Sequence, residues 1–182
     1  MNNDILQKYF IKNLYCTVAT VTPQGSPWAS PLYYGFDEKG ILYIRSSKNA
    51  QHMVNMRHSG QAFVTIFDSS QPIGTADGLY LQCSARELDR ADEITEALAI
   101  MNGRIGSNTN DPSKFMGAGP RRVVQLQPVM VWRNRAEVTP AGFIDYREEL
   151  PLSIKTDLGE PRSSGPEGFY KPNSSKNDKK SQ

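Results

Sequence analysis

The sequence predicts a mainly β (α+β) domain, a closed or nearly closed barrel of about six antiparallel strands with two or more short helices. Between residues 15 and 88, short β-branched and aromatic runs alternate with turn residues. Only two helical patterns interrupt the strands, and there is no strand–helix alternation of the kind that builds a parallel sheet. The length of 182 residues suits one domain, and no apolar run is long enough to span a membrane.

The first three strands form a meander. YCTVATVT ends at the turn PQGSP, WASPLYYGF follows, and the turn DEKG leads into ILYIR. QAFVTIFD and GLYLQCSAREL continue the sheet after polar loops, and RRVVQLQPVMVW is expected to supply one or two further strands. Six or so antiparallel strands of this length can close into a barrel.

Two short helices are expected between these strands. The first covers residues 49–56, with Ser46 or Ser47 as its N-cap, and the second covers residues 90–102, with Asp89 as its N-cap. One face of the second helix is apolar at helical spacing: Ile94, Ala97, Leu98 and Met101. This stripe is interpreted as core packing.

The chain divides into a folded domain, residues 1–158, and a polar tail, residues 159–182, which we expect to be disordered because it has few residues that can bury apolar surface. The tail holds five of the 21 Lys and Arg residues and three of the 19 Asp and Glu residues, so the domain itself is neutral. This balance makes nucleic-acid binding a minor alternative. The N-terminal residues lack the pattern of a signal peptide, so the default expectation is a cytoplasmic protein.

Several familiar catalytic and metal sites are not expected. Cys16 and Cys83 lie far apart in apolar runs and are interpreted as buried, reduced thiols. His52 and His58 are six residues apart, which does not place them on one helical face as a metal-binding pair. There is no nucleophile elbow and no Walker loop. The charged stretch 147–149 is interpreted as solvated surface.

The stretch YIRSSKNAQHM, residues 43–53, begins as a strand and ends as a helix. Alternation along the strand places Arg45 on the same face as Tyr43. The join carries two hydroxyls and two cations: Arg45, Ser46, Ser47 and Lys48. These groups and the free N–H groups of a helix N-terminus suit a phosphate monoester, whereas the other reading is an ordinary capped helix with solvated cations.

The neighbouring stretch WASPLYYGF favours the phosphate reading. Pro31 cannot donate a ladder hydrogen bond, so it is expected at a sheet edge or break where backbone can face a ligand. Nearby aromatic residues offer a flat apolar surface for a ring system: Trp28, Tyr33, Tyr34 and Tyr43. At least half of these rings are equally well explained as ordinary core residues.

ASPLYY, DEKG, YIRSSKNA and VMVWRNR together resemble the pyridoxamine 5′-phosphate oxidase-like family of split β-barrels. That resemblance implies an FMN-binding homodimer with the flavin at the subunit interface. Ser30, Pro31 and Leu32 would face the flavin ring, Ile44 and Arg45 would approach the phosphate, Ser46, Ser47, Lys48 and Asn49 would bind it, and Trp132 would lie against the flavin of the partner.

The chain also departs from that family. Ala29 and Tyr34 stand where the oxidase has Arg and Lys, and no Arg-x-His element follows Trp132, so a substrate other than pyridoxamine phosphate is expected. The leading hypothesis is an FMN-dependent oxidoreductase acting on a small molecule, with no catalytic residue assigned. The alternatives are a haem-binding module with His52 as axial ligand, a deazaflavin-binding protein, and a flavin-free barrel that binds a partner. His52 is not counted among the expected FMN contacts.

Overall fold

A computed structural model describes residues 9–72, 77–108, 110–140 and 142–151. They form an antiparallel sheet with the strand order β3-β2-β1-β4-β5-β6-β7. The strands are β1 (Tyr15–Val21), β2 (Pro27–Phe36), β3 (Leu42–Ser47), β4 (Gln61–Phe67), β5 (Gly78–Glu87), β6 (Arg121–Thr139) and β7 (Gly142–Leu150), and the helices are α2 (Gln51–Ser59), α3 (Ala91–Gly103) and the short 3₁₀ helix η1 (Pro112–Phe115).

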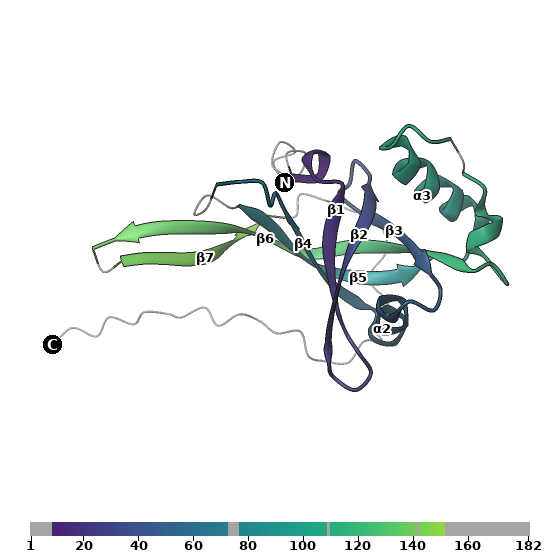
Figure 1. Ribbon diagram of the computed structural model, residues 1–182, viewed down its shortest axis with the longest axis horizontal. Helices are drawn as coiled ribbons and strands as arrows, with labels where there is room; N and C mark the ends of the chain where they lie inside the picture. The colour runs from purple at the N-terminus through teal and green to yellow at the C-terminus, as the bar shows by residue number, and fades with distance from the viewer. Residues whose placement is uncertain (1–8, 73–76, 109, 141, 152–182) are drawn as a thin grey trace.

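Strand β6 closes the sheet into a barrel because it pairs with strands at both ends of the series. Leu126 of β6 pairs with Ala85 of β5 and also with Leu42 of β3. Six strands are thereby joined in a ring, whereas β7 pairs only with the second half of β6. The β6–β7 hairpin projects away from the barrel (Figure 1). The predicted fold class is confirmed.

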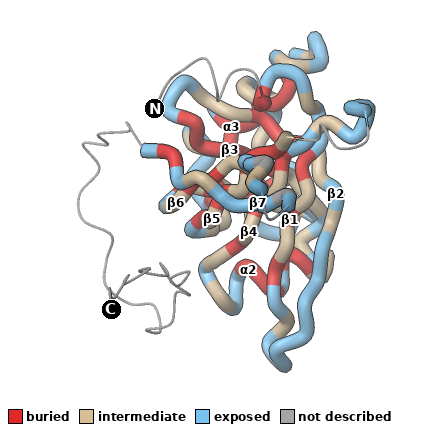
Figure 2. Tube along the Cα trace, turned by 90° about the vertical axis from the view of Figure 1, so that its left-hand side faces the viewer, coloured by how far each residue is buried: buried red, intermediate tan, exposed pale blue. Residues whose placement is uncertain are grey.

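Two hydrophobic clusters hold the two helices on the barrel. The inner cluster combines alternate residues of the strands, such as Val18, with Met53 and Met56 of α2. The other cluster joins Tyr43 and Val123 to the predicted stripe of α3: Ile94, Ala97, Leu98 and Met101, each 0% exposed. The helices lie on different sides of the strands, and buried positions concentrate where they pack (Figure 2).

The N-cap predicted for α2 is wrong. Ser46 and Ser47 still belong to β3, where they pair with Arg122 and Arg121 of β6. The backbone N–H of Lys48 then donates to Pro120 O at 3.0 Å, which extends the strand pairing by one residue. Because the chain stays bound to β6 up to this point, α2 begins only at Gln51, and its N-cap, Ala50, offers no side-chain hydrogen bond.

The N-cap predicted for α3 is also wrong. The backbone N–H of Leu88 donates to Val123 O at 2.9 Å, so the chain is still paired with β6 one residue beyond the end of β5. The helix therefore starts at Ala91, with Arg90 as its N-cap. Asp89 therefore lies one residue before the capping position. Asp92 and Glu93 occupy the first turn and still oppose the positive end of the helix dipole.

Strand β7 was not predicted, because its sequence GFIDYREEL was read in part as solvated surface. Its charges do pair along the hairpin: Glu148 accepts hydrogen bonds from Nε of Arg133 at 2.8 Å and from Nε of Arg135 at 2.6 Å. The predicted boundary at residue 158 and the tail, residues 159–182, lie outside the described residues.

The two cysteines are free and buried, as predicted. Burial raises the pKa of Cys16 to about 12, and burial also raises the pKa of Cys83. Both thiols are therefore unreactive parts of the core. In the described part of the chain, no helix combines the length and the apolar character needed to cross a membrane.

Candidate functional site

The first part of strand β2 has one unpaired edge, because β2 and β3 diverge there. Residues 27–33 pair with β1 on one side, whereas β3 pairs only with residues 34–36. β3 pairs with β6 along its whole length, but its pairing with β2 ends at Ile44. Among the described residues no strand therefore pairs with the second edge of β2 from Pro27 to Tyr33. Pro31 lies within this edge, in agreement with the prediction from its missing N–H.

The three residues predicted to face a ring do not share one face of β2. Ser30 and Leu32 lie opposite Val18 and Cys16 of β1, both of which face the inner cluster, whereas Pro31 is exposed on the other face. Strand alternation imposes this arrangement. A ligand that follows this edge would therefore contact the backbone of all three residues but the side chains of only one face.

The aromatic residues near this edge are mostly core residues. Tyr34 is 0% exposed and donates its hydroxyl to Phe10 O at 3.1 Å, and Tyr43 is buried against α3. Trp28 remains 47% exposed at the start of β2. Of the rings considered from the sequence, Trp28 is the one best placed to meet a ligand.

At the end of β3 the residues expected to contact a phosphate differ in burial and in hydrogen bonding. The side chain of Ile44 is 0% exposed in the inner cluster, so only its backbone can meet a ligand. Arg45 lies on the face covered by α3, where its Nη1 donates to Oδ1 of Asn102 at 2.9 Å. The guanidinium has five N–H donors, so this contact orients Arg45 without using all of them.

The side chains of Ser46, Ser47, Lys48 and Asn49 make no hydrogen bond or ion pair with the described residues. They precede the first turn of α2, which contains no acidic residue and has no side-chain cap. Uncommitted donors at a helix N-terminus favour an anion. The phosphate of a nucleotide-like cofactor would fit this donor set.

Arg121 was not predicted as a site residue from the sequence. It is exposed and lies directly opposite Ser47 in the β3–β6 register, so it brings another cation to the same join. Its side chain forms no ion pair within the described ranges. The sequence does show two consecutive arginines at the start of the last predicted strand, but only the pairing of β6 with β3 places them here.

A chain of hydrogen bonds links β2 to α2 behind the unpaired edge. Nε1 of Trp28 donates to Oγ of Ser30 at 3.1 Å, and that oxygen lies 3.2 Å from Nδ1 of His52. His52 is 7% exposed, and its burial lowers its pKa below the ordinary 6.5. The structure thus joins His52 to Ser30, one of the expected cofactor contacts.

Trp132 is not brought to this edge. It lies on the outer face of β6, is 8% exposed, and stacks on Phe63 with ring centroids 6.2 Å apart. The neighbouring ring of Tyr80 is covered by the guanidinium of Arg147 at 4.1 Å. A contact between Trp132 and a flavin would require a second subunit and remains a prediction.

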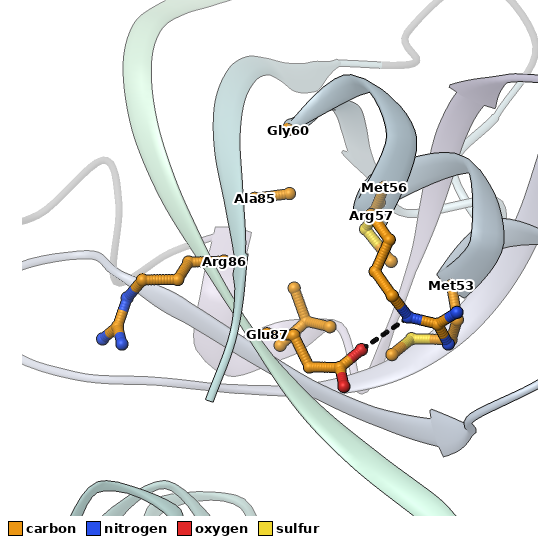
Figure 3. Close-up of a pocket in the computed structure, with 8 residues that line it drawn as sticks. Met53, Met56, Arg57, Gly60, Ala85, Arg86 and Glu87 are labelled. Atoms are coloured by element: carbon orange, nitrogen blue, oxygen red, sulfur yellow. Dashed lines mark hydrogen bonds and ion pairs between the residues drawn. The ribbon is translucent and has the colours of Figure 1, made fainter. Parts of the chain in front are cut away.

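A separate cavity of about 250 Å³ lies between α2, β5 and β6 (Figure 3). Met53, Met56 and Val124 supply its apolar lining, and Arg57 and Glu87 form an ion pair at 2.9 Å on its rim. None of the expected cofactor contacts lines this cavity. In the parts of the chain that the structure describes, no cluster of His, Cys, Asp or Glu is suited to hold a metal ion.

The family model described as pyridoxamine 5′-phosphate oxidase matches residues 4–135. Among solved structures, ChuZ from Campylobacter jejuni has a TM-score of 0.61 at 13% identity, over 92% of this chain and 65% of that chain. A heme binding protein from Mycobacterium smegmatis has a TM-score of 0.58 at 19% identity, over 81% and 58%.

An F420 reductase has a TM-score of 0.51 at 17% identity, over 69% of this chain and 94% of that chain. A search of curated proteins gave no match. Structural likeness at these identities shows the fold alone.

Proposed function

This chain belongs to the pyridoxamine 5′-phosphate oxidase family, and we propose on that basis that it is an FMN-binding flavoprotein and an oxidoreductase that acts on a small molecule. The observation that carries the proposal is the unpaired edge of β2 beside the uncommitted donors that follow β3. The edge offers backbone to a flat ring, and the donors offer hydrogen bonds and positive charge to a phosphate.

In the proposed complex, Lys48 and the hydroxyls of Ser46 and Ser47 hold the phosphate together with the first turn of α2, and the backbone of residues 30–32 lies along the ring. A bound flavin supplies hydride or electron transfer, and the protein supplies binding and orientation. Arg45 contributes through the N–H groups that its bond to Asn102 leaves free.

The proposed substrate is not pyridoxamine phosphate. Tyr34, which stands where the oxidase has a Lys, is fully buried and donates its hydroxyl to Phe10 O. This position therefore presents no cation to a substrate. Ala29 is exposed and likewise brings no charge. Neither position therefore offers a cation to the anionic substrate of the oxidase.

We also propose a cytoplasmic homodimer with the flavin near its interface. The β6–β7 hairpin projects from the barrel (Figure 1) and exposes Ile144 by 50% and Tyr146 by 48%. A two-stranded hairpin alone in water is marginally stable, so a second subunit is a suitable cover for it. In that dimer Trp132, which stacks on Phe63 in its own subunit, would lie against the flavin of the partner, as the resemblance to the family implies.

An absorbance spectrum of the purified protein, followed by FMN titration monitored by flavin fluorescence, tests the proposal. A flavin spectrum, or saturable FMN binding by the apoprotein, supports it. A Soret band would favour the haem alternative, whereas binding of F420 in preference to FMN would favour the deazaflavin alternative. A colourless protein that does not bind FMN would contradict the proposal.

Two matched lysine variants test the location of the phosphate. Lys48→Ala should weaken FMN binding about tenfold or more, because a charge-assisted hydrogen bond contributes about 1.5–3 kcal/mol. Lys39→Ala removes an exposed lysine in the turn before β3 and should bind FMN as the wild type does. Equal affinities for the two variants would place the phosphate elsewhere.

A further inference from the structure

His52 carries a buried nitrogen that has no partner. The residue is 7% exposed, and its Nε2 finds no hydrogen-bond partner in the described part of the chain. Buried polar atoms in proteins are nearly always paired, because leaving one unpaired is unfavourable. The unpaired Nε2 therefore indicates a position where a bound molecule supplies the missing partner.

The hydrogen bonds around Ser30 determine which nitrogen of His52 carries the proton. Oγ of Ser30 accepts the indole N–H of Trp28, which can only donate. Within the described residues, Nδ1 of His52 is the acceptor that lies within reach of the Ser30 hydroxyl hydrogen. If that hydrogen goes to Nδ1, the neutral imidazole carries its own hydrogen on Nε2.

The other tautomer is less well satisfied. If Nδ1 carried the proton and donated to Ser30, both the Ser30 hydroxyl hydrogen and Nε2 of His52 would lack a partner. The lowered pKa of His52, which its burial causes, favours the neutral form at pH 7. Nε2–H is thus a neutral donor that needs an acceptor.

The surroundings of His52 favour an anionic acceptor. His52 is the second residue of α2, and the backbone N–H groups of Gln51 and His52 have no acceptor among the described residues. The first turn contains no acidic side chain, and the ammonium of Lys48 is uncommitted close by in the chain. Several donors and no carboxylate are therefore gathered around one turn.

We propose that His52 is a further ligand-binding residue of this site and that its Nε2–H donates a hydrogen bond to an oxygen of the phosphate-bearing part of the ligand. This inference rests on the proposed function, since it takes the ligand to be a phosphorylated cofactor. It also gives Ser30 a specific part, because Ser30 fixes the tautomer of His52 and Trp28 in turn orients Ser30.

Two substitutions of His52 separate its two nitrogens. His52→Asn keeps a polar group near the position of Nδ1, in reach of Ser30, and removes the donor at the position of Nε2. His52→Gln places an amide near the position of Nε2. His52→Asn should weaken FMN binding about tenfold or more, and His52→Gln should recover most of the affinity.

His58→Asn is the matched control, because His58 is exposed near the end of the same helix. It should bind FMN as the wild type does, and thermal melts should show that all three variants are folded. His52→Asn that is folded and binds FMN as tightly as the wild type would overturn the inference.

Nitrogen-15 NMR of the imidazole gives a readout that does not depend on activity. The ligand-free protein should show His52 in the Nε2–H tautomer, and adding FMN or inorganic phosphate should shift that N–H signal. An Nδ1–H tautomer, or no response to either probe, would overturn the inference. A response to inorganic phosphate without FMN binding would support the role of His52 while contradicting FMN as the ligand.

Hemin is the remaining probe. An iron ligand must give up its proton at Nε2, so a Soret band that is present in the wild type and lost in His52→Asn would also overturn the inference.

Discussion

Replacing Arg104 by methionine should lower the free energy of unfolding by about 3 kcal/mol. Arg104 follows α3, and its guanidinium donates to Tyr34 O at 2.7 Å, to Phe10 O at 2.6 Å and to Asn13 O at 3.1 Å. It also lies 4.8 Å from the ring centroid of Tyr34 and 5.0 Å from that of Phe36. One side chain thus ties the end of α3 to β2 and to the N-terminal segment.

The magnitude follows from these contacts. A hydrogen bond to a charged group contributes about 1.5–3 kcal/mol, so the two shortest bonds contribute about 3–6 kcal/mol. Without Arg104, Phe10 O still accepts a hydrogen bond from the hydroxyl of Tyr34, so it is not left unpaired. The expected loss of unfolding free energy is therefore near the lower end of this range. Methionine retains an apolar stem over the two rings, so the loss reports mainly on the hydrogen bonds.

Urea and thermal unfolding would measure the effect. For a chain of this size, about 3 kcal/mol corresponds to a melting temperature roughly 6–12 °C lower. Hydrogen exchange should also become faster in residues 9–14, which Arg104 holds. The control is Arg90→Met at the other end of α3, where the ion pair with Asp92 is exposed and the melting temperature should not change. Equal melting temperatures for the two variants would refute the reasoning.

Two further predictions concern packing and pH. Gly35→Ala should destabilise the protein by about 1–3 kcal/mol in urea unfolding, because the added Cβ would lie 2.9 Å from Cα of Met101, where α3 packs on β2. An unchanged urea midpoint would show that α3 can move aside. Because burial lowers the pKa of His52 in the folded protein, its contribution to stability is present above about pH 6.5 and is lost as the pH falls below that value. Unfolding measured from pH 8 to pH 5 should show a weaker dependence in His52→Gln than in the wild type, and identical slopes would contradict this assignment.

Much of the barrel could be predicted because its signals are local. The alternation that buries Cys16 and Val18 is visible within one strand, and the four-residue stripe of α3 is visible within one helix. Pro31 marked the unpaired edge correctly, because a missing N–H limits where a residue can lie in a sheet. The assignment of Ser46, Ser47 and Lys48 to a phosphate site stays a prediction, and their side chains have no hydrogen bond or ion pair with the described residues.

The errors arose where pairing with a distant strand decided the outcome. Both helix N-caps were placed too early, because β6 holds the chain through Pro120 O and Val123 O beyond the expected ends of the strands. Strand β7 was missed because the sequence around Glu148 is polar on both faces, and a hairpin outside the barrel needs no apolar alternation.

By itself, the sequence determined where the first six strands lie along the chain, the apolar faces of α3 and of the barrel interior, and the gathering of hydroxyls and cations after β3, since each depends on residues a few positions apart. Only the tertiary structure decided that Arg45 contacts Asn102, that Arg121 stands opposite Ser47, and that His52 meets Ser30. The physical reason is that strand register and helix placement follow from packing summed over the whole barrel, and no short stretch of sequence contains that sum.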